Sequence, residues 1–473
     1  MAAKFLQCSA TELQQPLESG ELTSEQLVTA YLEQIERHNV HGMGLNAINS
    51  VAPRELDAIV TDPALGMLTT VGSHVFANMR AKGNAPLVDQ LIDNGLIILG
   101  KANLTEFCGH NPYPWRSYEP PGWSAYGGQT NSAHRRPGLT EEDQPTAAGS
   151  SSGPAASIAA GFCPLSIGTQ TGGSLVYPAS TSGLYGMTLG PDAVCTDGVF
   201  KISPPFDLIG VMARTPQDVG LLAKSILTPE VRLKTPYDGL GLDFTGSWSD
   251  LAIGIAPLGA AGSDEFCWQC SCSGTFAHGE QKEKYDRVAS ILSERGAKVV
   301  FPLELPDAME TLQSEREMMH SIAYHKFPDE IALFIENFNE TSGIKTLDDI
   351  IQWNAAHAEK ALPDPHTEQR ALIESRDNKM TKETHTRPAS SAIMAENGLD
   401  IVLTNSESQL VAYAACAIWP MATVPLGNLE HNGQPFGFFA VAGAGKEDIL
   451  LKFMKLFEAT FPAVERPKVP FER

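Results

Sequence analysis

The sequence predicts an α/β protein, because segments with a helical pattern alternate with short, fully apolar segments of the kind that form buried strands. Residues 86–94 have a helical pattern that Gly95 stops, and the apolar run at 96–99 follows directly. The same alternation returns at 251–302, where an apolar run, a helical pattern and a second apolar run follow one another. We find no internal repeat and no flexible linker, so we expect one domain covering residues 1–473.

The other elements follow from periodicity and capping signals. Thr23 and Gln26 have the spacing of a capping box, and an apolar stripe at helical spacing follows them. Residues 111–145 are rich in Pro, Gly, Trp and Tyr and predict a long ordered loop. Residues 306–395 are mostly charged, have a helical pattern and contain no recognisable chemical motif. The expected helices are 24–35, 86–94, 215–227, 280–295 and 446–461, and the expected strands are 96–99, 164–168, 251–255, 297–302, 400–403, 422–426 and 437–442.

Charge and cysteine content exclude several classes of function. The chain has 56 acidic and 34 basic residues, a net charge of -22, and no compensating basic run, so we expect neither nucleic acid nor an anionic membrane as a partner. The N-terminal residues lack a secretory pattern, no apolar run is long enough to span a bilayer, and the eight cysteines are too sparse for a disulfide scaffold, so we expect a cytoplasmic protein. Cys267, Cys270 and Cys272 cluster without a second Cys/His pair at zinc spacing, so we expect no metal site.

The chemistry is concentrated in a stretch dense in Ser and Gly, at residues 147–186. Three hydroxyls, Ser150 to Ser152, precede a run of small residues that suits a closely packed helix. Further on, the sequence Thr171-Gly172-Gly173-Ser174 places paired glycines beside a hydroxyl, so backbone N–H groups can converge there. The stretch therefore predicts a serine nucleophile with an oxyanion hole; the alternative is a Gly/Ser-rich surface loop.

This stretch resembles the signature of the amidase signature family, whose members hydrolyse amides and some esters with a Ser, cis-Ser, Lys triad. Ser150 and Ser174 stand 24 residues apart, which fits the family's spacing. Further segments also resemble sequences of the family: 22–35, 97–104, 122–130, the run ending at Asp207, and 424–439.

The resemblance implies a large mixed central β-sheet flanked on both faces by α-helices. Its signature part would cover about 1–230, and 231–473 would complete the sheet and cover the pocket. It implies a small amide as the substrate, no cofactor, and a homodimer as a possible assembly. By the same resemblance Ser174 is the nucleophile, and Ser150 is the bridging serine that follows a cis peptide bond. The oxyanion hole would comprise Thr171, Gly172 and Gly173, and the substrate-binding residues would be Gly128 and Gln129.

The third member of the triad is where the chain departs from the family. The position of the lysine is occupied by Thr61, and the segment ahead of it is shortened. A threonine hydroxyl is not a base near neutral pH. Three explanations stay open: a degenerate family member with a binding, scaffold or non-hydrolytic biosynthetic role, a substitute base, or a sequence that lacks an exon. The substitute bases to consider are Lys101, Lys82, His74 and His110, each of which also has an ordinary structural interpretation.

Overall fold

The fold is built around a mixed β-sheet, as the sequence predicts. The computed structural model describes residues 2–53, 66–109, 121–233, 246–257, 275–304, 308–378, 392–406, 408 and 410–470. The largest sheet among them has eight strands in the order β10-β9-β12-β14-β13-β7-β8-β6. Strand β9 is parallel to β10 and β12, and the other neighbouring pairs are antiparallel. The strands are β6 (Leu165–Gln170), β7 (Tyr185–Thr188), β8 (Leu208–Ala213), β9 (Ala252–Ile255), β10 (Lys298–Val300), β12 (Ile401–Asn405), β13 (Met421–Asn428) and β14 (Pro435–Ala442).

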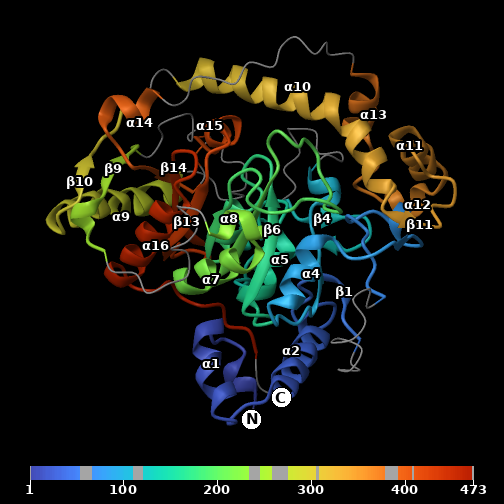
Figure 1. The fold of residues 1–473 in the computed structure, drawn as a ribbon, viewed down its shortest axis with the longest axis horizontal. Helices are drawn as coiled ribbons and strands as arrows, with labels where there is room; N and C mark the ends of the chain where they lie inside the picture. The colour runs from blue at the N-terminus through green and yellow to red at the C-terminus, as the bar shows by residue number, and fades with distance from the viewer. Residues whose placement is uncertain are drawn as a thin grey trace.

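Helices cover both faces of this sheet (Figure 1). The alternation along β14 shows why: Phe438 and Ala440 enter the core on one face, and Phe439 and Val441 enter the core on the other. The first face is covered by α4 (Pro86–Asp93), α7 (Pro216–Ile226), α9 (Thr275–Glu294) and α16 (Glu447–Thr460). The second is covered by α5 (Ser152–Ala159), α6 (Val176–Thr181) and α15 (Leu410–Ala417). The predicted α/β class, with helices on both faces, is confirmed.

One predicted strand is wrong. Residues 96–99 are not a strand; the strand begins only after them, at Gly100, as β3 (Gly100–Ala102), and it pairs antiparallel with β1 (Ile48–Val51). Leu96 and Ile98 still pack against the main core, while Leu99 packs against the N-terminal helices. The apolar residues 96, 98 and 99 therefore reflect partial burial of a connection outside the sheet, whereas Ile97 is exposed.

The N-terminal helices pack beside the end of the chain. Helix α1 (Ala10–Glu18) and helix α2 (Ser24–His38) lie at one end of the molecule, next to the last described residues (Figure 1). The predicted capping box of Thr23 and Gln26 is present at the start of α2. At its end, the Nε2 atom of His38 lies 2.9 Å from the carbonyl oxygen of Pro470. This contact joins the end of α2 to the last described residues.

The charged segment expected to be helical is described at 308–378 and 392–395, and it is mostly helical there. Helix α10 (Ala308–Ile335) is followed by α11 (Leu347–Ala356), α12 (Ala358–Ala361) and α13 (Arg370–Asp377). Phe327 and Phe334 of α10 make edge contacts with Phe200, and Phe327 also contacts Phe107. Aromatic packing therefore holds this layer on the part of the chain that resembles the family signature.

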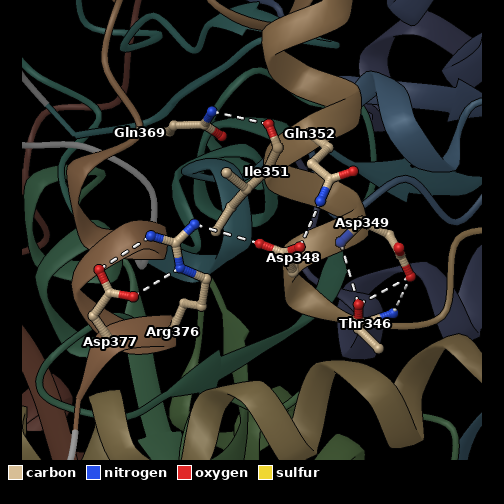
Figure 2. Close-up of polar contacts among 8 residues, drawn as sticks. All are labelled: Thr346, Asp348, Asp349, Ile351, Gln352, Gln369, Arg376 and Asp377. Carbon is tan, nitrogen blue, oxygen red and sulfur yellow. Dashed lines mark hydrogen bonds and ion pairs between the residues drawn. The ribbon is translucent and has the colours of Figure 1, made fainter.

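Polar contacts fasten α11 to α13 (Figure 2). The Arg376 guanidinium lies between the carboxylates of Asp377, at 2.8 Å, and Asp348, at 3.4 Å. Gln369 donates to the carbonyl of Ile351 at 3.0 Å. The shorter elements are η1 (Ala2–Phe5), η2 (His74–Phe76), β2 (Arg80–Ala81), η3 (Glu106–Gly109), β4 (Trp123–Ser124), β5 (Gly128–Gln129), η4 (Glu141–Asp143), α8 (Pro229–Arg232), η6 (Trp248–Asp250), β11 (Phe338–Asn339) and α14 (Ala392–Asn397). None of the helices in the described ranges combines the length and the hydrophobicity needed to cross a bilayer.

Candidate active site

The predicted nucleophile lies in a tight turn between β6 and α6. Gly173 has φ +105°, and a Cβ atom there would lie 2.3 Å from the Tyr177 ring, so only glycine fits without strain. Gln170 ends β6, and its Oε1 atom accepts from the backbone N–H groups of Leu175 and Val176, at 3.1 Å each. Ser174 is partly exposed between buried neighbours. The turn therefore presents one hydroxyl from a rigid support.

The backbone N–H groups of this turn are available to a ligand. Among the hydrogen bonds of the described residues, none uses the N–H of Gly172, Gly173 or Ser174, whereas the carbonyl of Gly173 accepts from Tyr177 at 3.0 Å. Converging N–H donors that need no rearrangement are what stabilises an oxyanion. The oxyanion hole of Thr171, Gly172 and Gly173 stays a prediction, and the unused N–H groups of Gly172 and Gly173 are compatible with it.

The predicted bridging serine lies beside this turn at the start of α5. The N–H of Ser151 donates to the carbonyl of Ser174 at 2.9 Å, so the two serine segments are in direct contact. Ser151 Oγ bonds the backbone of Thr169 twice, donating at 3.0 Å and accepting at 3.2 Å. The hydroxyl of Ser150 is buried and has no hydrogen-bond partner among the described residues. The structure therefore brings the two segments together but does not join the hydroxyls of Ser150 and Ser174.

The cis peptide bond implied for Ser150 is not found. In the described ranges, cis peptide bonds precede Pro302 and Pro365 only. The chain instead changes direction through two residues with left-handed backbone, Ala148 at φ 53° and Gly149 at φ 52°.

The base side of the site is less complete. Thr61 lies outside the described residues, as do His110 and the cysteine cluster at 267–272. Within the described part of the chain, no group of three or more His, Cys, Asp or Glu side chains could hold a metal ion.

Lys101 bonds to the neighbouring segment at residues 67–69. Its Nζ donates to the carbonyl of Met67 at 3.2 Å and to Thr69 Oγ1. Burial lowers the pKa of its ammonium group, which favours the neutral form that a base requires. The unpartnered hydroxyl of Ser150 shows, however, that Lys101 does not reach it.

The other described candidates for a base also have structural surroundings. Burial lowers the pKa of His74, whose ring packs edge-on to Tyr126 at 5.4 Å between centroids. Lys82 is exposed, and its backbone N–H donates to Asn337. The described part of the chain therefore brings no alternative base into hydrogen-bond contact with Ser150.

The two predicted substrate-binding residues form part of a small hairpin, β4 and β5. Gln129 Nε2 donates to the carbonyls of Pro121 and Thr130, at 3.2 and 3.1 Å. The carbonyl of Gly128 accepts from Asn103 Nδ2 at 3.0 Å. These polar groups support the loop, and a direct role of Gly128 and Gln129 in binding stays a prediction.

Sequence reasoning assigned no role to Asp207, which the structure places beside the turn. The carboxyl of Asp207 accepts from Thr171 Oγ1 and from the backbone N–H groups of Ile202 and Ser203, at 2.8 and 2.7 Å. Burial raises the pKa of Asp207 to about 7, although these three hydrogen bonds favour its ionised form. The sequence signal is the run that ends at Asp207, which resembles the amidase signature family.

Asp207 and Thr171 both face a small cavity of about 40 Å³. Its volume suits a few water molecules and is too small for a whole amide substrate. Its polar lining comes from Thr169, Thr171, Thr196, Lys201 and Asp207.

The chain is similar in sequence to known amidase-family proteins. A model of the family described as Amidase matches residues 59–237. The A subunit of glutamyl-tRNA(Gln) amidotransferase from Deinococcus radiodurans is 31% identical over 252 residues, 49% of this chain and 48% of that protein. A Schizosaccharomyces pombe protein named as an amidase is 25% identical over an alignment of 524 residues, 97% of this chain and 86% of that protein. The chain thus spans about half the length of the amidotransferase subunits that it matches.

Solved structures share the fold over the whole chain. The native peptide amidase from Stenotrophomonas maltophilia superposes with a TM-score of 0.77 at 23% identity, covering 100% of both chains. An amidase family protein from Bacillus anthracis gives a TM-score of 0.78 at 22% identity, covering 99% of this chain and 94% of that one.

Proposed function

The chain belongs to the amidase family, and we propose on this premise that it hydrolyses the carbon–nitrogen bond of a small amide with Ser174 as the nucleophile. The observation that carries the proposal is the hydrogen bond from Ser151 N to the carbonyl of Ser174 at 2.9 Å. It holds the segment of Ser150 against the nucleophile turn, which is the arrangement that a Ser-Ser relay requires. Peptide amidase is among the proteins with the same fold, which supports an amide as the substrate class.

The proposed reaction proceeds in two steps. Ser174 Oγ attacks the amide carbonyl carbon and gives up its proton through Ser150, and the N–H groups of Gly172 and Gly173 stabilise the oxyanion. The C–N bond then breaks, and the amine leaves with the proton that Ser174 gave up through Ser150. In the second step water attacks the acyl-serine ester, releases the acid and restores the Ser174 hydroxyl.

A second candidate function is a binding or scaffold protein that retains the pocket without turnover. Two observations favour it: position 61 holds a threonine, and the buried hydroxyl of Ser150 has no partner among the described residues. In the family mechanism this hydroxyl passes its proton to a lysine, and without a base the nucleophile keeps its own proton. Residual acceleration from the oxyanion hole alone is on the order of 10³ to 10⁴ over water.

Hydrolysis of small acyl anilides by the unmodified chain and by the Ser174→Ala variant tests the first function. We expect slow turnover by the unmodified chain and none by Ser174→Ala. The matched control, Ser249→Ala at an exposed serine, should keep the turnover of the unmodified chain. Equal turnover with and without the Ser174 hydroxyl would refute the proposal. Binding of the anilide, seen as a rise in Tm without any release of aniline, would favour the second function.

A further inference from the structure

Thr171 and Asp207 form a pair that continues the sheet beyond its last ladder position. Strands β6 and β8 are antiparallel, and their register ends with Gln170 opposite Leu208. Thr171 and Asp207 are the next residues on the two strands, so they face each other across the same ladder. Strand β6 is at the edge of the sheet, so β8 is its single strand neighbour among the described residues.

The Asp207 carboxyl joins two turns across this pair. One oxygen accepts from the Thr171 hydroxyl, and the other accepts from the backbone N–H groups of Ile202 and Ser203. The turn at 202–207 is itself closed, because the carbonyl of Ser203 accepts from the N–H groups of Phe206 and Asp207, at 2.9 and 3.0 Å. The carboxyl therefore ties Thr171 to a turn that has its own internal support.

The residue held in this way leads directly into the nucleophile turn. Thr171 precedes Gly172 and Gly173, which lack side chains that could fix their orientation. The structure holds the turn on one side through Gln170, which binds the N–H groups of Leu175 and Val176. The Thr171 hydroxyl is the corresponding tie on the side of the cavity.

We propose that Asp207 is a positioning residue for the nucleophile turn: its carboxyl holds the Thr171 hydroxyl and thereby sets the direction of the Gly172 and Gly173 N–H groups. The inference rests on the proposed function, because it assigns these N–H groups to the oxyanion of that reaction. It adds Asp207, which acts through Thr171 and does not touch the substrate, to the residues that the reaction requires.

The test compares variants of the two partners with a matched control on the same strand. Thr171→Val removes the hydroxyl at almost constant volume, and Asp207→Ala removes the carboxyl. Thr169→Val is the control, because Thr169 lies on β6 and lines the same cavity while its hydroxyl is not bonded to Asp207. Thr171→Ser restores the hydroxyl and serves as the rescue variant.

The first readout is the rate at which a fluorophosphonate labels Ser174. We expect Thr171→Val and Asp207→Ala each to slow labelling about 10- to 100-fold, less than the loss of an oxyanion donor itself. The double variant should be no slower than the slower single variant, since both break one tie. Thr171→Ser should recover most of the rate, and Thr169→Val should stay within about threefold of the unmodified chain. Additive losses, or an unaffected Thr171→Val, would overturn the inference.

The second readout does not depend on reaction at Ser174. Hydrogen exchange at the N–H groups of Ser151, Leu175 and Val176 reports on the turn, because all three bond to it or to Gln170 beside it. We expect exchange about tenfold faster in Thr171→Val than in Thr169→Val. Equal exchange in the two variants would refute the positioning role even if the protein proves to be an amidase. If the unmodified chain shows no reaction but exchange responds as expected, the proposed function fails and the positioning role stands.

Discussion

The candidate site has a nucleophile side, around Ser174, and a base side, around Lys101 and Ser150. The two sides differ in how many hydrogen bonds connect their residues. On the nucleophile side, backbone and side-chain hydrogen bonds link β6, the turn at Ser174, α5 and the 202–207 turn. On the base side, Lys101 Nζ bonds only to Met67 and Thr69 in the described part of the chain, and the hydroxyl of Ser150 has no partner there. The difference indicates that the fold preserves the nucleophile turn without help from the base, because its contacts also serve the packing of α5 and α6.

The largest effect is expected from Gly173→Ala. A methyl group would force a left-handed φ on alanine and would meet the Tyr177 ring at 2.3 Å. We expect a loss of about 2–5 kcal/mol in the free energy of unfolding, measured by urea titration. Gly443→Ala is the matched control, because its nearest neighbour, Lys446 Cγ, lies 4.0 Å away. Equal losses in the two variants would show that the turn is not rigid.

Asp207→Asn tests the cost of the buried carboxyl on the nucleophile side. Asp207 has a pKa of about 7 in the folded chain, against 3.8 as its ordinary value, so the folded state keeps a proton that the unfolded state loses between these values. The native chain should therefore lose stability relative to Asp207→Asn as the pH rises from 3.8 to 7, by at most about 1.4 kcal/mol per pH unit, with no further change above pH 7. Below pH 3.8 both states are protonated and the difference is constant.

Other titratable and charged groups near the Asp207 carboxyl also affect its protonation in this experiment. Glu330 and Cys108 lie close enough to couple with Asp207, and Lys201 lines the same cavity. Asp197→Asn, at an exposed carboxyl on the loop before Asp207, is the control. A pH dependence of Asp207→Asn that matches the native chain would contradict the assigned pKa.

The two neighbouring serines at the start of α5 should respond in opposite ways. Ser151→Ala loses two hydrogen bonds to Thr169 and should cost about 1–2 kcal/mol of stability. Ser150→Ala removes a buried hydroxyl that has no partner among the described residues, so stability should be unchanged or should rise by up to about 1 kcal/mol. Thermal unfolding of the two variants distinguishes these outcomes, and a larger loss in Ser150→Ala would mean that its hydroxyl is bonded in solution.

The smallest effect is expected from Lys101→Met on the base side. The long apolar side chain preserves the packing, so stability at pH 7 should change by less than about 1 kcal/mol, and fluorophosphonate labelling of Ser174 should stay within about threefold. Burial lowers the pKa of Lys101 in the folded state, so the unfolded state holds the extra proton up to its ordinary pKa of 10.5. The native chain should therefore gain stability relative to Lys101→Met as the pH rises toward 10.5. Loss of labelling in Lys101→Met would make Lys101 the base.

The sequence predicted the local parts of this molecule better than those that depend on register. Periodicity and capping signals predict the helices at 86–94 and 215–227 and the strands at 400–403, 422–426 and 437–442. The paired glycines predict the turn at Gly173. The pair of Thr171 and Asp207 could not be predicted, because it joins residues 36 apart through the alignment of β6 with β8. The prediction of a strand at 96–99 is wrong because a partly buried connection and a strand can have the same apolar pattern.

The packing of the helices α10 to α13 also depends on contacts between residues far apart in the sequence. Aromatic packing of α10 on Phe200 and Phe107 stabilises this layer, and no periodic motif in the sequence announces such contacts. The prediction of one domain over 1–473, with a signature part at about 1–230, stays a prediction, as do the cytoplasmic location and the homodimer. Thr61 lies outside the described residues, so the explanation for the missing lysine also stays open.

The central proposal is that the nucleophile turn is assembled although Thr61 stands at the position expected for the activating lysine. Incubating the native chain with a fluorophosphonate and locating the adduct by mass spectrometry tests it most directly, with Ser174→Ala and Lys101→Met as comparisons. The account predicts slow labelling at Ser174, none in Ser174→Ala, and nearly unchanged labelling in Lys101→Met. Absence of an adduct at Ser174, or labelling that requires Lys101, would contradict it.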